Sequence, residues 1–167
     1  MPTQSYYELL EQLMEHQKKQ MLWRWQIFQA AEILRSSLSS SLGVEYLTYD
    51  EGRYRYVELF TPALTPLHLT ADGVIEYVQR MPTVNIVIVV ALELDSGITF
   101  CVCPVQIRVA HKIVEYRISK DGGRWISDVH VMLKWVYQAL KENISKIPTS
   151  SCTLAHFPHK NTGKLPV

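Results

Sequence analysis

Hydrophobic side chains near the N-terminus recur every three to four positions, which is the spacing of one helix face. The helix face that this spacing defines passes through Leu9, Leu13, His16, Gln20, Trp23, Ile27, Ala31, Leu34 and Leu38. It predicts one long helix from about Tyr6 to Leu38, ended by a serine-rich segment and Gly43. At 1.5 Å per residue this helix would be roughly 50 Å long, which is long for a domain of this size.

A polar segment interrupts this hydrophobic helix face between Glu15 and Gln20. Two interpretations follow from the interruption. Either the helix breaks there, or its first half projects from the domain and packs against something else. The pattern alone leaves both open.

The middle of the chain consists of short runs of β-branched and aromatic residues separated by turn sequences. Three of the connections, at 50–52, 71–73 and 95–97, end in glycine. Connections this short join antiparallel strands, because parallel strands need long crossovers. We therefore expect an antiparallel meander of six to seven strands between residues 44 and 119. The run 84–94 is apolar on both faces, which predicts a central strand.

A second amphipathic stripe predicts a C-terminal helix over about 128–144, which Pro148 ends. The last residues, 149–167, are polar and contain two prolines and a glycine, a composition typical of a flexible tail. The predicted fold is therefore α+β: one domain over 1–148, with helices laid on a curled antiparallel sheet, followed by the tail over 149–167.

Composition supports one ordinary folded domain and limits the cellular compartments that we expect for it. The chain has 167 residues, of which 47% are hydrophobic and 20% charged, so a disordered chain is excluded. The longest nearly uncharged apolar run, Val84–Leu92, is too short to span a membrane. The polar start lacks the features of a signal peptide, and three cysteines argue against a disulfide scaffold. We expect a cytoplasmic protein without a membrane segment.

Charge is distributed unevenly along the chain although the formal total is only +1. Residues 1–100 carry −5 and residues 101–167 carry +6. Such a gradient favours either a polyanion-binding face or attraction between two copies, unless the charges intermingle in the fold. The basic residues that would contact a nucleic acid are Arg108, Lys112, Arg117, Lys120, Arg124, Lys134 and Lys141. No RNA-binding or zinc-finger motif accompanies them.

The sequence offers weak candidates for catalysis or metal binding. Cys101 and Cys103 point to the same side of a strand. They could form a metal site with Cys152, His156 and His159 only if the tail folded back. Two buried thiols acting as small hydrophobic residues explain the pair better. Neither a nucleophile elbow nor a phosphate-binding glycine loop occurs. We therefore expect no catalytic residue, metal or cofactor.

One ligand-binding alternative remains open at this stage. Strand tyrosines could line a cup for a small apolar ligand or a substrate. They are Tyr46, Tyr54, Tyr56, Tyr77 and Tyr116. The simpler explanation is that tyrosine is a good strand former.

The leading hypothesis comes from two tryptophans on the long helix. Trp23 and Trp25 lie about 200° apart around the helix axis, so they cannot both face the same core. Tryptophan beside arginine is typical of protein-binding surfaces. The predicted interface consists of Trp23, Arg24, Trp25 and Phe28. We expect a non-enzymatic inhibitor, adaptor or accessory subunit that binds another protein or a second copy of itself. A nucleic-acid-binding protein, and an enzyme or ligand carrier with a tyrosine-lined pocket, are the alternatives.

Overall fold

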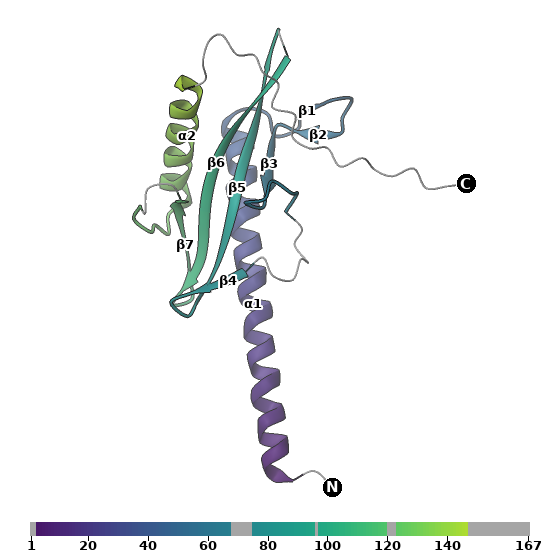
Figure 1. Ribbon diagram of the computed structural model, residues 1–167, viewed down its shortest axis with the longest axis vertical. Helices are drawn as coiled ribbons and strands as arrows, with labels where there is room; N and C mark the ends of the chain where they lie inside the picture. The colour runs from purple at the N-terminus through teal and green to yellow at the C-terminus, as the bar shows by residue number, and fades with distance from the viewer. Residues whose placement is uncertain (1–2, 68–74, 96, 120–122, 147–167) are drawn as a thin grey trace, which may run out of the picture.

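The computed structural model describes residues 3–67, 75–95, 97–119 and 123–146, and these form an α+β fold (Figure 1). A long helix, seven strands and a second helix follow one another in that order. The predicted tail over 149–167 lies outside the described residues. No helix among the described residues combines the length and hydropathy that a membrane crossing needs.

Helix α1 (Gln4–Ser41) is continuous for 38 residues, so the polar segment does not break it. Its buried residues all lie between Ile27 and Ser39, where it packs on the sheet. Every residue from 3 to 19 is exposed. Figure 1 shows this first half extending well beyond the sheet. The structure thus confirms the long helix and decides between the two interpretations, because the first half projects.

The strands pair antiparallel throughout, in a five-stranded sheet and a separate two-stranded ribbon. They are β1 (Thr48–Tyr49), β2 (Tyr54–Arg55), β3 (Val57–Phe60), β4 (Ile75–Val78), β5 (Met81–Leu94), β6 (Gly97–Ala110) and β7 (Ile113–Ile118). The order β3-β5-β6-β7 is not a simple meander, because β3 pairs with β5 rather than with β4. Strand β5 is 14 residues long, so β3 and β4 fit one after the other along the same edge.

Two tight turns form without the glycine or asparagine that usually marks them. Gln79 and Arg80 join β4 to β5 with φ angles of 51° and 65°, and His111 and Lys112 join β6 to β7 with 49° and 68°. The first of these hairpins was not predicted, because neither residue is a typical turn former. The hairpin predicted around 71–73 lies outside the described residues.

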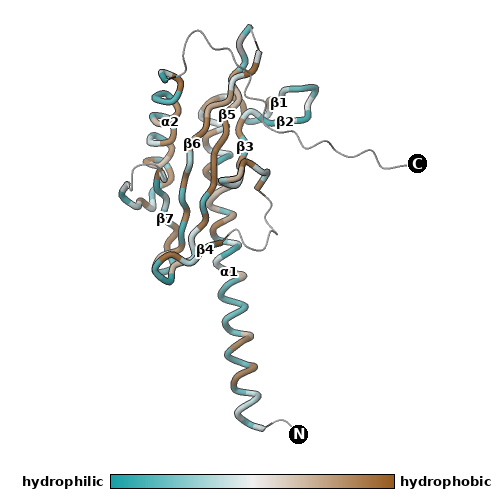
Figure 2. The backbone as a smooth tube through the Cα atoms, in the orientation of Figure 1, coloured by the Kyte–Doolittle hydropathy of each residue, from teal (hydrophilic) through white to brown (hydrophobic). Residues whose placement is uncertain are grey.

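Both helices cover the same face of the sheet. Strand positions facing them alternate, and they include Val84, Ile86, Ile88 and Val90 in β5 and Cys101, Cys103, Val105 and Ile107 in β6. Helix α2 (Val129–Ser145) adds Met132, Val136 and Leu140 to this core. It begins where the Asp128 carboxylate accepts hydrogen bonds from the backbone N–H groups of His130 and Val131, at 2.8 and 3.3 Å. Figure 2 shows the hydrophobic central strands behind which α1 runs.

Candidate functional site

The projecting half of α1 carries the largest set of exposed hydrophobic side chains in the part of the chain that the structure describes. We call residues 4–25 the arm. Its exposed large hydrophobic residues are Tyr6, Tyr7, Leu9, Leu10, Leu13, Met14, Met21, Leu22 and Trp25. Met21 is 72% and Trp25 61% exposed. Single exposed hydrophobic residues are ordinary on a protein surface, but a contiguous set marks an interaction site.

Most of these side chains share one face of the arm. At 100° per residue they occupy an arc of about 120°, which is the width of an ordinary buried helix face. This face, which we call the stripe, consists of Tyr6, Tyr7, Leu10, Leu13, Met14, Met21 and Trp25. Glu8, Glu15 and Lys19 occupy the opposite side, and Glu11 and Lys18 lie beside the edge of the stripe. The arm is therefore amphipathic, although no part of its own domain covers the stripe.

Polar residues in the middle of the arm hydrogen-bond within the helix. The Nε2 atoms of His16 and Gln20, one turn apart, lie 3.0 Å from each other. Gln17 stands in the line of the stripe, between Met14 and Met21. The polar interruption seen in the sequence is thus a polar band across an unbroken helix.

The structure separates the four residues predicted to form the interface. Trp23 is half-buried and packs edge-to-face against Tyr77 of β4, with ring centroids 6.4 Å apart. Trp25 is exposed, so the two tryptophans face different surroundings, as the angle between them predicts. Arg24 is half-buried, whereas Phe28 is only 5% exposed and offers little surface to a partner. The sequence argument missed the rest of the stripe, because it followed the face that continues into the core. The signal was present, since Tyr7, Met14 and Met21 recur at intervals of seven.

The basic residues predicted to contact nucleic acid do not gather on one face. Arg108 and Arg117 lie on the face of the sheet opposite the two helices, and their guanidinium groups stack on Trp125 at 4.0 and 4.5 Å from the ring centroid. Lys134 and Lys141 lie on α2, which covers the other face.

The remaining members of that set are scattered as well. Lys112 lies in the β6–β7 turn and Arg124 is an exposed neighbour of Trp125. Lys120 lies outside the described residues. The structure therefore forms no continuous positive stripe from these residues in the ranges that it describes.

A row of hydrogen-bonded polar side chains crosses four strands on the face opposite the helices. The amide of Asn85 donates to Glu76 at 3.3 Å, and Gln106 donates to Asn85 at 2.6 Å. Arg117 in turn donates to Gln106. In the next row Arg108 donates to Glu115 at 2.7 Å. These contacts use donors that a phosphate would otherwise accept from, and the sequence analysis did not foresee them because strand register decides them.

The five tyrosines proposed to line a cup do not all come together. Tyr54 and Tyr56 pack with Tyr49, at centroid distances of 5.5 and 5.4 Å, while Tyr116 is buried in the core. Tyr46 is exposed. Burial, helped by the nearby Glu58 carboxylate, raises the pKa of Tyr49 to about 12. The tyrosine rings around Tyr49 therefore pack against one another rather than around a cup.

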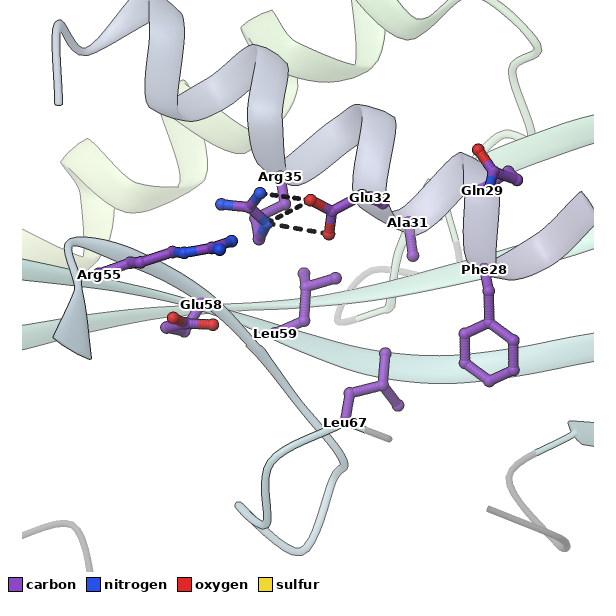
Figure 3. A pocket seen from close by; sticks show the side chains of 9 residues that line it. All are labelled: Phe28, Gln29, Ala31, Glu32, Arg35, Arg55, Glu58, Leu59 and Leu67. Carbon is purple, nitrogen blue, oxygen red and sulfur yellow. Dashed lines mark hydrogen bonds and ion pairs between the residues drawn. The ribbon is translucent and has the colours of Figure 1, made fainter. Parts of the chain in front are cut away.

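A small cavity of about 220 Å³ lies between α1 and β3 (Figure 3). It is lined by Phe28, Gln29, Ala31, Glu32, Arg35, Arg55, Glu58, Leu59 and Leu67. Arg35 Nε donates to both carboxylate oxygens of Glu32 at 3.0 Å, and this hydrogen bonding lowers the pKa of Glu32. Burial raises the pKa of Glu58, partly offset by Arg55 and Arg35. The cavity is smaller than typical ligand sites, and its charges largely compensate one another.

The buried thiols offer no reactive group. Cys101 and Cys103 are free, and burial raises both of their pKa values, that of Cys103 to about 12. A thiol with so high a pKa stays protonated at neutral pH and is a poor nucleophile and metal ligand. Within the described ranges, no three His, Cys, Asp or Glu side chains gather closely enough to hold a metal ion.

Comparison of the chain with family models, with curated proteins and with solved structures finds no match. The functional conclusion therefore rests on the geometry of this chain alone.

Proposed function

We propose that this protein is a non-enzymatic interaction protein, an inhibitor, adaptor or accessory subunit, that binds another protein through the arm. The single observation that carries the proposal is the stripe: seven exposed hydrophobic side chains on one face of a helix that extends beyond its own domain. A helix that lays its apolar face into a groove or onto another helix is a common mode of protein recognition.

The anchoring of the arm supports this role. An isolated helix of about 20 residues is only marginally stable in water, because nucleation is unfavourable. The arm, however, continues a helix whose second half is buried in the core, so its nucleus already exists. A partner would meet a preformed surface and would lose little affinity to the ordering of the helix.

The arrangement of the charged residues favours protein binding over nucleic-acid binding. The two arginines best placed on a sheet face, Arg108 and Arg117, are engaged with Trp125 and with neighbouring polar side chains. The proposal includes a cytoplasmic location, with which the free thiols of Cys101 and Cys103 are compatible because disulfides are rare there.

The test places charge on the stripe of the full chain. The double variant Leu10→Asp/Met14→Asp adds two negative charges to the stripe, and Gln4→Asp/Gln12→Asp adds the same charge on the opposite side of the arm. Affinity capture followed by mass spectrometry, with light scattering of the purified protein, compares them with the unchanged chain. We expect a complex or oligomer that the stripe variant loses and the control keeps. Equal behaviour of both variants, or no associated species at all, would contradict the proposal.

A further inference from the structure

We propose that the partner of the arm is a second copy of this chain, bound as two arms packed antiparallel and crossing at residues 15–16. This inference rests on the proposed function, because it takes the stripe as the binding surface. It adds the identity of the partner, the direction of the pairing and its register.

The spacing of the stripe is that of a helix pair. Tyr7, Met14 and Met21 are separated by seven residues, and Leu10 and Gln17 lie three positions after Tyr7 and Met14. This alternation of three and four is the seam that two helices share in a coiled coil. All five residues belong to the exposed part of α1. The seam covers about four turns, and the buried Phe28 continues its spacing where the arm meets the core.

The order of charges along the arm sets the direction. The first half carries Glu8, Glu11 and Glu15, and Lys18 and Lys19 follow in the second half. In a parallel pair the acidic halves would lie together, whereas in an antiparallel pair each acidic half faces a basic half. The opposed helix dipoles of an antiparallel pair add to this preference.

The seam then fixes the register. With the crossing at residues 15–16, Leu10 packs against Met21 of the second copy, and Met14 against Gln17 of the second copy. The flanking position beside Leu10 is Glu11, and the same register brings it to Lys18 of the second copy. The two-fold symmetry repeats this ion pair on the other side of the crossing. Hydrophobic side chains therefore meet at both ends and the polar band of each arm meets the other at the centre.

The same geometry keeps the two domains apart along the helix pair. The stripe lies to one side of the face by which α1 packs on the sheet, and antiparallel arms carry their domains at opposite ends. The N-terminal Tyr6 and Tyr7 of each copy reach the base of the other arm. There the second copy presents Trp25, which is 61% exposed.

Charge reversal of the full chain tests this arrangement, with the dimer constant measured by sedimentation equilibrium at low ionic strength. The unchanged chain is expected to form a dimer of twice its 19.3 kDa. Glu11→Lys and Lys18→Glu, each alone, place like charges at both flanking contacts and should weaken the dimer about tenfold. Mixing the two variants, or combining them in one chain, restores opposite charges and should return affinity to within about threefold of the original.

Each contrary outcome has a distinct meaning. A monomer at about 100 μM overturns self-pairing. The proposed function is then still decided by the affinity-capture experiment, which asks whether a captured partner protein is lost in Leu10→Asp/Met14→Asp. A dimer that Leu10→Asp/Met14→Asp dissociates but that ignores both charge reversals overturns the antiparallel register. A dimer that survives the stripe variant overturns both proposals. Circular dichroism of each variant confirms that the helix is intact, and Gln4→Asp/Gln12→Asp again serves as the control.

Discussion

Trp23 of α1 and Tyr77 of β4 meet edge-to-face at the point where the long helix leaves the sheet. Their ring centroids lie 6.4 Å apart and the planes are inclined at 67°. Trp23 also packs against the hydrophobic core, so this pair ties the base of the arm to the edge strand. The pair marks the boundary between the buried and the projecting halves of the helix.

Removal of the Trp23 ring should therefore destabilise the domain, in contrast to removal of its neighbour. We expect Trp23→Ala to lower the free energy of unfolding by about 1–3 kcal/mol, because the contacts of a half-buried ring and an aromatic pair are lost. Trp25→Ala, at an exposed position of the same helix, should change it by less than about 0.5 kcal/mol in the monomer. Urea unfolding of dilute protein compares the two variants. Equal losses of unfolding free energy would mean that Trp23 does not anchor the base of the arm.

The β4–β5 turn is strained in a way that a substitution can relieve. Gln79 and Arg80 both adopt positive φ, which costs a residue with a side chain about 1 kcal/mol. Gln79→Asn/Arg80→Gly should raise the free energy of unfolding by about 0.5–1 kcal/mol, since asparagine and glycine suit this turn.

The β6–β7 turn supplies the matched comparison for this prediction. His111→Asn/Lys112→Gly makes the same change at the same backbone angles and should give a similar gain. Thermal melts of the two double variants and the parent measure the effect. Destabilisation by both pairs would mean that the side chains make contacts worth more than the strain.

The pH dependence of stability should carry opposite contributions from Glu58 and Glu32. Burial raises the pKa of Glu58 in the folded state above 4.5, so its ionisation opposes folding as pH rises through this range. Glu58→Gln should therefore be more stable than the parent at pH 7, and the difference should vanish below about pH 4.

The contribution of Glu32 to the pH dependence of stability has the opposite sign, because the hydrogen bond from Arg35 lowers the pKa of Glu32 in the folded state below 4.5. Its stabilising effect is complete above pH 4.5 and is lost as pH falls through the lowered value. Glu32→Gln should thus be less stable than the parent at pH 7 and approach it in acid. Urea midpoints at pH 7 and in acid for both variants test the pair. A gain from Glu32→Gln at pH 7 would contradict the geometry of this ion pair.

Cys103 should resist alkylation while the protein is folded. Burial raises its pKa to about 12, and no part of the side chain is exposed. Iodoacetamide at pH 8 is expected to modify it only after unfolding, at least about a hundredfold more slowly in native protein. Peptide mass spectrometry follows the site individually and distinguishes it from the other cysteines. Rapid native labelling would show that the sheet opens locally.

The sequence predicted the helices better than the sheet, for a physical reason. The hydrophobic residues of α1 recur at helical spacing on both sides of its polar segment, and the amphipathic pattern of α2 is a local signal as well. The pairing of β3 with β5 depends on contacts between residues that are distant in the chain. The turn at Gln79 and Arg80 contains neither of the residue types, glycine and asparagine, that usually indicate a turn. Local patterns cannot decide such pairings.

The candidate surface shows the same division. That Trp23 and Trp25 face different surroundings follows from the angle between their helix positions, and it was predictable, whereas which of the two is exposed was not. That Phe28 is buried, and that Arg108 and Arg117 stack on Trp125, depends on how the sheet and the loop before α2 come together. The stripe of the arm was visible in the sequence but could not be recognised as uncovered until the extent of the sheet was known.

The continuity of α1 makes the arm and the core one cooperative unit. The same ladder of backbone hydrogen bonds runs from the free end into the buried half, and no cap or break separates them. Whatever binds the arm suppresses fraying from that end and adds its binding free energy to the folded state. The melting temperature should therefore rise with the concentration of the occupant, so occupancy of the arm can be measured by the unfolding of a core that the occupant never touches.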